Sequence, residues 1–546
     1  MLSSLSEKKM HVIRWGVFLA WALLIVSLFY DPISATLTNS NHSWSPLADS
    51  TMTMANDPDH CVSAQGYCIS LEPYPIGLRV FWGMVVPSAI FVVFVFGHEF
   101  WRRICPLYFF SQLPRALGMK PLLDIKQNAW LQNNHLYVQF VLFFSGITAR
   151  ILLINSVRPA AGVFFILTLL SAAVVVMLYG GRSWCHYICP FGMVQTVFTG
   201  PRGLLDSTAH QAAPYSITQS MCRTVVSDQD RDGQAQEQSA CVSCKSSCMD
   251  IDSEQAYWEQ LHKPGRRLVQ YGYLGLVIGY FAYYGLYAGN FNYYFSGVWS
   301  HESRAAIAML DPGFYMAQHA IGIPKIIAAP LTLAAFAAAS CWLCTQLERT
   351  YRGYLQQRSG SSSGNSSGNS SDNSPQLPAD QGLHRMFSLC TFLAFNIFFI
   401  YGGRPEINRW PLAAQFGFQA IIGVLSSLWL ARTWSRSREL YQKESMASKL
   451  KLQIKRQLSQ SVLGLSNLSE MLSEPDLKQL NAEETSLLAK MLAQLVQVEQ
   501  VNQVGARSQS TTADENFTIP QTVLKRNLSS TDSVNPILPT TRIRKR

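Results

Sequence analysis

Charged residues are scarce in this chain of 546 residues: 14% are Asp, Glu, Lys or Arg, whereas 48% are hydrophobic. A soluble globular domain normally carries more charge on its surface, so this composition argues against one large water-soluble core. The apolar residues also occur in separate blocks along the chain. The composition therefore predicts an all-α polytopic membrane protein.

About eight apolar blocks are candidates for transmembrane helices. Several are short for a complete crossing, which leaves room for one buried or re-entrant segment among them. The candidates are Ile13–Tyr30, Val80–Gly97, Leu136–Ile154, Ala160–Gly180, Leu268–Tyr287, Ile326–Leu343, Met386–Tyr401 and Ala413–Leu430.

Lys and Arg are absent from the longest loop of this arrangement, Asp31 to Leu78. They gather instead before the first span and after the second, fourth, sixth and eighth spans, which all lie on the opposite side. Because positively charged loops remain in the cytoplasm, both termini are expected to be cytoplasmic. A cleaved signal peptide is the alternative for the first span, but the length of its apolar run favours a retained helix.

Five of the twelve cysteines are interpreted without a metal. Cys61 and Cys68 lie in the cation-free loop, where an oxidising compartment would permit a disulfide; two free thiols are the alternative. Cys341, Cys344 and Cys390 lie in or beside apolar spans and are interpreted as small buried hydrophobic residues.

The strongest chemical signal is residues 181–190, GRSWCHYICP, which end the fourth candidate span. Closely spaced thiolates followed by a proline are typical of iron–sulfur ligands, because each iron requires a soft sulfur on a turning backbone. In a regular helix, Cys185 and Cys189 would share one face about one turn apart. Pro190 would then end or redirect that helix.

A weak repeat of this motif ends the second candidate span at residues 97–106, GHEFWRRICP. An ungapped alignment pairs glycine with glycine and Cys105 with Cys189. The same alignment places Trp101 opposite Cys185, so the first copy is half a motif. Cys105 is therefore either a ligand or a buried structural thiol.

A second cysteine group, Cys241, Cys244 and Cys248, has Cys222 upstream. Ferredoxin clusters combine a tight run of three cysteines with a distant fourth. This run is Cys-x2-Cys-x3-Cys and no proline follows it, so a standard bacterial two-cluster domain is not expected. A structural zinc site is the alternative.

The cysteines expected on the cytoplasmic side are enough for one 4Fe-4S cluster and one short of two, so one or possibly two clusters are predicted. Haem is not expected, because His98 and His186 lie near span ends and Cys-x-x-Cys-His is absent. The candidate ligands are Cys105, Cys185, Cys189, Cys222, Cys241, Cys244 and Cys248.

These motifs resemble those of the NapH/NosR-type membrane ferredoxins. The resemblance covers Phe81 to Trp258 and depends on Cys-x3-Cys-Pro at Cys185 to Pro190, the earlier Cys105-Pro106 and the downstream cysteine group. It implies a polytopic protein with 4Fe-4S centres on the cytoplasmic side that supplies electrons to respiratory enzymes or assists their maturation. The altered cysteine run leaves the number of clusters and the partner open.

Composition divides the chain into successive parts. These are a six-span core at 1–346 that contains the cysteine-rich segment 181–258, a Gly/Ser linker at 347–383, two further spans at 384–431, a cytoplasmic helical hairpin at 432–505 and a disordered basic tail at 506–546. The hairpin is either an ordinary packed helix pair or a module for a partner protein or self-association. The basic tail suits anionic lipid better than nucleic acid.

The sequence thus predicts an integral membrane iron–sulfur protein that passes single electrons at the cytoplasmic face. A redox protein or quinone would be its donor or acceptor, and it would be a carrier more than a bond-making catalyst. Two alternatives stay open: a membrane redox sensor or assembly factor, and a zinc-stabilised membrane scaffold.

Overall fold

The computed structural model describes residues 7–39, 42, 43, 45, 61–71, 73–117, 119, 121–123, 128–180, 183–205, 225–229, 235–239, 253–302, 307–362 and 376–447. Most of the expected C-terminal hairpin and the whole basic tail lie outside these residues. So do four candidate ligands: Cys222, Cys241, Cys244 and Cys248.

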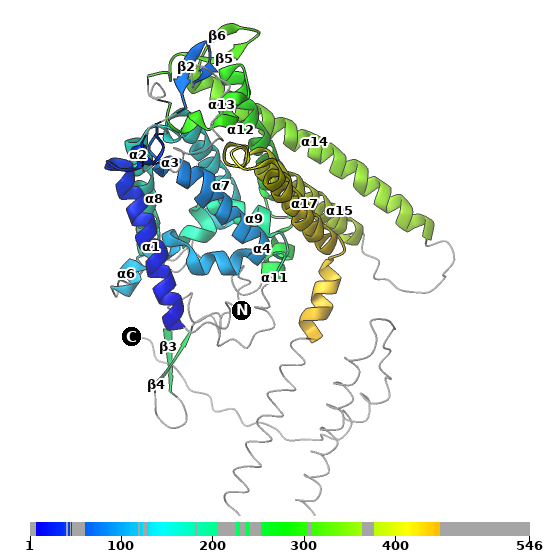
Figure 1. Cartoon of the computed structure of the whole chain (residues 1–546). Helices are drawn as coiled ribbons and strands as arrows, with labels where there is room; N and C mark the ends of the chain where they lie inside the picture. Colours follow the sequence, from blue (N-terminus) through cyan, green and yellow to red (C-terminus); the bar gives the residue numbers. More distant parts are fainter. Residues whose placement is uncertain are drawn as a thin grey trace, which may run out of the picture. The chain divides into compact units, whose positions relative to one another are not determined.

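Helices dominate the described chain (Figure 1). The longer ones are α1 (Glu7–Phe29), α4 (Val86–Ile104), α7 (Ala129–Ala149), α8 (Arg158–Tyr179), α9 (Pro190–Thr199), α11 (Ser253–Gln260), α12 (Tyr273–Ala288), α14 (Lys325–Ser362), α15 (Gln376–Asn396) and α17 (Leu412–Trp434). Shorter helices are α2 (Ser34–Leu37), α3 (Gly77–Val80), α5 (Pro106–Ser111), α6 (Leu113–Ala116), α13 (Asn292–Ser296), α16 (Arg404–Ile407) and the 3-10 turn η7 (Val298–Ser300). Five π-helical turns extend or precede longer helices: η2 (Phe81–Val85), η4 (Arg150–Ile154), η5 (Trp184–Ile188), η6 (Leu268–Gly272) and η8 (Ile397–Tyr401).

Seven helical segments of the described chain are long and apolar enough to cross a membrane. Each contains or largely overlaps one of the eight expected spans, so the apolar blocks locate these helices correctly. The segments are Val12–Phe29, Gly77–His98, Ala129–Ile154, Arg158–Tyr179, Lys325–Leu355, Asp380–Ile407 and Leu412–Trp434.

The remaining expected span, Leu268–Tyr287, is also helical but is not among these seven. It forms η6 and α12, and almost every side chain of α12 is buried inside the protein. Gly275 allows close packing against α14, because a Cβ atom there would be 2.4 Å from the Phe336 carbonyl oxygen. Neighbouring helices therefore surround this segment, which explains how it carries many tyrosines where a lipid-facing helix would carry aliphatic residues.

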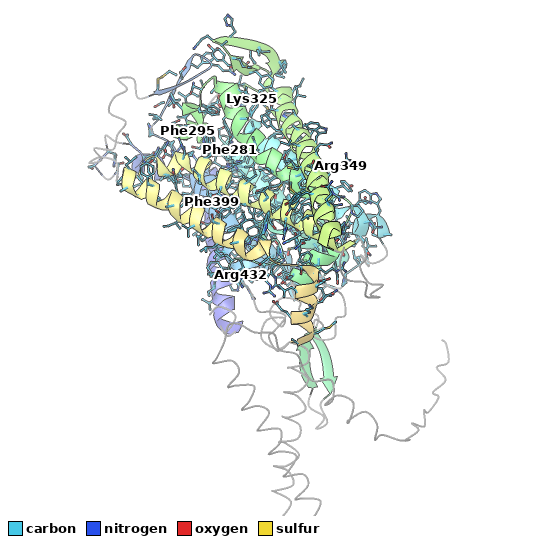
Figure 2. The ribbon with its side chains drawn as sticks, turned by 90° about the vertical axis from the view of Figure 1, so that its right-hand side faces the viewer. Phe281, Phe295, Lys325, Arg349, Phe399 and Arg432 are labelled. Atoms are coloured by element: carbon cyan, nitrogen blue, oxygen red, sulfur yellow. A yellow bond between two sulfur atoms is a disulfide. The ribbon has the colours of Figure 1, made fainter. Side chains whose placement is uncertain are left out.

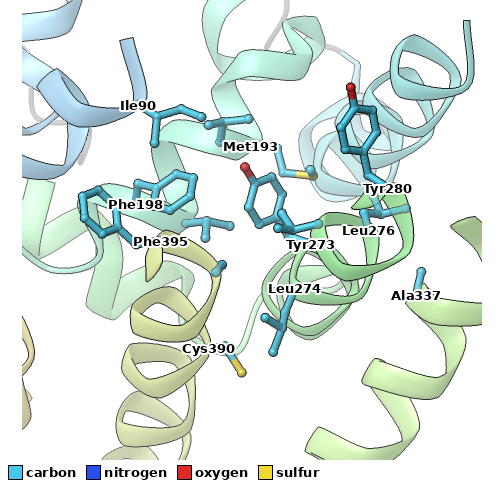
Figure 3. Close-up of a cluster of buried hydrophobic side chains, with 14 of the residues drawn as sticks. Ile90, Met193, Phe198, Tyr273, Leu274, Leu276, Tyr280, Ala337, Cys390 and Phe395 are labelled. Carbon is cyan, nitrogen blue, oxygen red and sulfur yellow. The ribbon is translucent and has the colours of Figure 1, made fainter. Parts of the chain in front are cut away.

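The core packs around α12, as Figure 3 shows for Met193, Phe198, Tyr273 and Phe395. Phe198 meets Tyr273 edge to face, with ring centroids 5.4 Å apart. The rings of Phe395 on α15 and Phe198 have centroids 6.1 Å apart. Helices α15 and α17 therefore belong to the same core as the helices that precede them.

Three antiparallel hairpins are present in the described chain: β1 (Cys61–Ala64) with β2 (Tyr67–Ser70), β3 (Val225–Gln229) with β4 (Ala235–Ser239), and β5 (Pro312–Met316) with β6 (His319–Pro324). Strands β2, β5 and β6 lie together at one end of the molecule (Figure 1). A disulfide joins Cys61 to Cys68 within the first hairpin, which is the pairing that the sequence suggested. The Gln65 amide fixes this hairpin by donating to the carbonyl oxygens of Tyr287 and Pro312, at 3.0 and 2.8 Å.

The segment expected to be a linker begins as a helix. α14 continues through Ser362, whereas residues 363–375 lie outside the described chain and α15 begins at Gln376. After α17, residues 438–447 are helical again. In Figure 2, Lys325 at the start of α14 and Arg432 on α17 lie toward opposite ends of the helices.

Candidate iron–sulfur site

Two long helices, α4 and α8, are broken by glycines in the same conformation. Gly97 has φ 78° and ψ 178°, and Gly180 has φ 70° and ψ −179°. Residues with a side chain rarely adopt this positive φ, so both positions require glycine. The structure therefore equates Gly97 with Gly180, whereas the ungapped sequence alignment paired it with Gly181.

Each break is followed by a cysteine at a second change of direction. Cys105 has φ −61° and ψ 118°, and Cys189 has φ −53° and ψ 119°. Pro106 and Pro190 then occupy the first position of α5 and α9, where the missing N–H of proline costs nothing. The two Cys-Pro hinges are thus structural equivalents, as the sequence repeat predicts.

Residues 203–205, which follow the Cys189-Pro190 hinge, pack against the interruption of α4 at Gly97. Interrupting the helix at Gly97 frees carbonyl oxygens, and that of Val95 accepts a hydrogen bond from the Leu205 amide at 2.7 Å. Gly203 lies directly against Gly97. The second half of the repeat therefore supplies a hydrogen-bond donor to a carbonyl oxygen that the interrupted helix of the first half leaves free.

Residues 121–123, which follow the Cys105-Pro106 hinge, pack in the same way against the end of α8 at Gly180. The Leu123 amide donates to the Leu178 carbonyl oxygen at 2.7 Å, and Pro121 packs on Gly180. Leu123 corresponds to Leu205 and Pro121 to Gly203. The two halves are reciprocally interlocked, which places their cysteine hinges at one shared interface.

The second hinge contains one residue more than the first. The Cys105 amide bonds to the Trp101 carbonyl oxygen, four residues earlier, whereas the Cys189 amide bonds to that of Trp184, five residues earlier. The π turn η5 accommodates the extra residue, and π turns of this kind are frequent at functional sites. Trp101 is therefore equivalent to Trp184. The alignment of Trp101 with Cys185 was therefore wrong, and a π turn, not a regular α-helix, connects Cys185 to Cys189.

Gln139 of α7 supports this π turn. Its side-chain amide lies 3.1 Å from the carbonyl oxygen of His186 and 3.5 Å from that of Cys185, and only 2% of the residue is exposed. A Cβ atom on Gly192 would be 2.7 Å from the same Cys185 oxygen. The turn that carries Cys185 is thus held from α7 and packed against α9.

Cys189 is buried at the start of α9. Burial raises the pKa of its thiol to about 11, opposed by the backbone amides of Gly192 and Phe191 and by the Trp184 indole. These N–H groups favour the thiolate, as helix N-termini do. A sulfur ligand here would therefore be screened from water but stabilised by donors.

Cys105 has the equivalent surroundings. Burial raises the pKa of its thiol to about 12; the Tyr108 and Leu107 amides oppose this effect, while the charge of Cys189 adds to it. The Cys189 thiol is thus close enough to influence the ionisation of Cys105. Each would give up its proton on binding a metal.

The described part of the chain contains three of the seven candidate ligands. It brings Cys105 and Cys189 together, and it places Cys185 in the apolar cluster that contains Cys189 and Trp184. No three His, Cys, Asp or Glu residues within the described ranges form a complete metal site. A four-sulfur ligand set would require cysteines outside these ranges.

Comparison with family models supports the iron–sulfur interpretation of the Cys189 hinge. Residues 163–206 match the model of a 4Fe-4S binding domain. No curated protein and no solved structure matches the chain. The 4Fe-4S domain contains most of α8, the Gly180 break, Cys185, Cys189 and all of α9. It supports an iron–sulfur binding protein and does not extend to Cys105.

Two buried indoles suit the neighbourhood of an anionic cluster. The buried Trp184 indole faces Cys189 and favours its thiolate, whereas the buried Nε1 of Trp101 has no hydrogen-bond partner among the described residues. Such an unpaired donor is costly in a protein interior. Trp101 also packs on Phe191 at 5.1 Å, across the two halves of the repeat. Both indoles could donate to cluster or ligand sulfur, so the residues present fit an iron–sulfur group.

A buried ion network lies beyond the C-terminal end of the 4Fe-4S domain. Glu254 of α11 is 1% exposed and pairs with Arg202 and with Arg436, the latter at 2.9 Å. Both arginines also contact Glu444, at 3.2 and 2.8 Å. Burial raises the pKa of Glu254, and the two arginines oppose that effect. The network joins the end of the cysteine-rich segment to the helix at 438–447.

Sequence reasoning missed Gln139, Trp101, Trp184 and the supporting segments after each hinge. Gly180-Gly181 contained a usable signal, because either glycine could be aligned with Gly97. Choosing Gly180 requires a one-residue insertion before Cys189, and this insertion is the π turn. The contacts of Gln139 and of the supporting segments have no comparable signature in one sequence.

Proposed function

We propose that this protein is a membrane-bound electron carrier that passes single electrons at the cytoplasmic face to a redox partner. The observation that carries the proposal is the pairing of two equivalent Cys-Pro hinges, one of them inside the 4Fe-4S domain. Reciprocal packing of the two halves gives this pair a fixed position at one end of the long helices.

The chain's residues would perform three tasks. Cys189 and Cys185, with Cys105, would supply sulfur ligands, joined by cysteines of the group from Cys222 to Cys248. Apolar burial would exclude water, and the indoles of Trp101 and Trp184 would donate hydrogen bonds that tune the potential. A bound 4Fe-4S cluster supplies the capacity to accept and release one electron.

The orientation follows from charge. Arg202 follows α9, Arg432 lies in the last turn of α17 and Arg436 follows that helix, whereas residues 31–78 contain no Lys or Arg. This distribution supports a cytoplasmic position for the cysteine hinges and for both termini. A quinone or a redox protein would be the donor, and a second redox protein the acceptor.

The test is iron, zinc and acid-labile sulfide content of anaerobically purified full-length protein, with electron paramagnetic resonance after reduction by dithionite. About four irons and sulfides per chain with a reduced-cluster signal would support one cluster, and about eight would support two. Zinc without sulfide would overturn electron transfer in favour of a membrane scaffold.

Variants then assign the ligands. Cys189→Ser and Cys105→Ser should each lose iron and visible absorption. Cys341→Ser is the matched control, because Cys341 lies in α14 within an apolar span, and it should retain both. Full iron and an unchanged spectrum in Cys189→Ser would remove the hinge from the ligand set.

A redox sensor is the second candidate, and the Glu254 network favours it. That network connects α11, at the end of the cysteine-rich segment, to the helix at 438–447. A sensor would change protease exposure of the C-terminal region when the cluster is oxidised or reduced. Identical cleavage in both states, together with rapid electron exchange, would leave the carrier as the function.

A further inference from the structure

Arg266 is a buried cation without a carboxylate partner among the described residues. It is 2% exposed, and the one hydrogen bond that its side chain makes to the described residues runs from Nη2 to the Thr196 carbonyl oxygen at 3.3 Å. Its Nε and Nη1 atoms are buried and unpaired. The hydroxyl of Thr199, on the same helix as Thr196, is also buried and unpaired.

The neighbouring Arg267, in contrast, has a carboxylate partner. Its Nε and Nη2 atoms each lie 3.0 Å from an oxygen of Glu348, so this guanidinium is neutralised by a two-point ion pair. Arg267 is also the more exposed of the two. The more deeply buried arginine is thus the one without a counter-ion among the described residues.

The surroundings of Arg266 offset its charge only in part. The ring centroids of Tyr257 and Phe387 lie 5.5 Å from its guanidinium carbon, and the Thr196 carbonyl, in the last turn of α9, accepts a hydrogen bond from it. Burial lowers the pKa of Arg266 to about 10, which still leaves it charged at neutral pH. A buried charge of this kind normally has an ionic partner.

A small cavity lies where that partner would bind. Gln195, Thr199, Ser253 and Gln260 line it together with Arg266. The cavity volume is about 10 Å³, which is room for one particle about the size of a water molecule. A polyatomic anion such as phosphate would not fit without displacing the walls.

We propose that this cavity binds one halide-sized inorganic anion, held by the Arg266 guanidinium and the Thr199 hydroxyl. A water molecule would fill the space but would not neutralise the charge. The anion would connect α9, which begins at the Cys189 hinge, to α11, which lies at the end of the cysteine-rich segment. Its binding would therefore stabilise the packing of α11 on the 4Fe-4S domain.

The experiment measures the unfolding midpoint of the purified full-length protein in chloride, bromide or gluconate at constant ionic strength. Chloride and bromide should raise the midpoint saturably, by about 2 °C or more, relative to gluconate. Arg266→Met should lose this response. Arg267→Met is the matched control: it removes the adjacent ion pair but should keep the halide response.

Two further measurements keep the proposal testable if Arg266→Met does not fold. Thr199→Val retains the cation and should weaken the halide response at least threefold in apparent affinity. Anomalous scattering from crystals grown in bromide should give a peak beside Arg266. A midpoint indifferent to the halide, an equal response in Thr199→Val, or no bromide peak would mean water or a carboxylate of this chain fills the site, and would overturn the proposal.

Discussion

Gly203 lies against Gly97 so closely that a Cβ atom on Gly203 would be 2.6 Å from the Gly97 nitrogen and 2.9 Å from its Cα. Both obstructing atoms are backbone, so neither can rotate away. The adjacent Leu205 amide bonds to the Val95 carbonyl oxygen, freed by the same break in α4. The two halves of the repeat thus meet backbone to backbone beside the cysteine hinges.

Gly203→Ala should separate these halves. We expect a loss of about 1–3 kcal/mol in the free energy of unfolding, because the added methyl group cannot be accommodated without a backbone shift. Iron content should fall as well, since Cys105 depends on this contact for its position beside Cys189. Gly146→Ala is the control: nothing lies within 4 Å of its added Cβ, so its stability and iron content should stay at or slightly above the wild-type values. Equal behaviour of the two variants would contradict the reciprocal packing.

Glu254→Gln should destabilise the protein more than the same substitution at the exposed Glu259 on the same helix. The carboxylate side chain is 2% exposed and faces Arg202 and Arg436, whose side chains are 14% and 11% exposed. Removing its charge leaves two largely buried cations with only the more exposed Glu444 as an ion-pair partner, so we expect a loss of about 3 kcal/mol. Chemical unfolding measures this loss. Glu259→Gln on the same helix, at an exposed position, should change stability by less than about 0.5 kcal/mol.

Apolar blocks predicted the helices well because burial in a membrane and helix formation both depend on uninterrupted runs of apolar residues. The run at 268–287 was a weaker case: its tyrosines interrupt the hydropathy, and the helix they form is enclosed by protein. The Cys-Pro hinges were also predictable, since proline after cysteine fixes a helix start wherever it occurs.

The partners of those hinges were not predictable from one sequence. Leu123 and Leu205 act through their backbone amides, which any residue except proline possesses, so no side-chain pattern marks them. The π turn at Trp184–Ile188 depends on a one-residue insertion that Gly180-Gly181 conceals. The burial of Arg266 was not predictable either, because nothing in the sequence distinguishes its guanidinium from that of the adjacent Arg267.

His301 should make the packing of the first hairpin sensitive to pH. Its Nε2 donates to the Ser70 carbonyl oxygen at 2.9 Å, and its ring stacks on Tyr74 at 4.8 Å. Burial lowers the pKa of His301 below its usual 6.5, so protonation favours the state in which the ring is released. Stability should be greatest above about pH 6.5 and decline as pH falls toward the lowered pKa.

Hydrogen exchange of residues 61–70, measured between pH 5 and 8 and corrected for intrinsic rates, tests this dependence. His301→Gln should remove it. His319→Gln, at an exposed position on β6, should retain it. A pH response that survives in His301→Gln would assign the titration to another group.

Cys344 and Cys390 should form a disulfide when a membrane-permeable oxidant is added. Their sulfur atoms lie 3.8 Å apart between α14 and α15, both residues are buried, and a modest side-chain rotation would bring them into bonding range. With a protease site introduced within residues 363–368, oxidised protein should remain one species on a non-reducing gel after cleavage and separate into two fragments on reduction. Cys344→Ser should separate without reduction, whereas Cys341→Ser should behave as wild type. Fragments that separate in oxidised wild-type protein would show that α14 and α15 do not pack at these cysteines, and unchanged iron in all three proteins would keep this pair outside the ligand set.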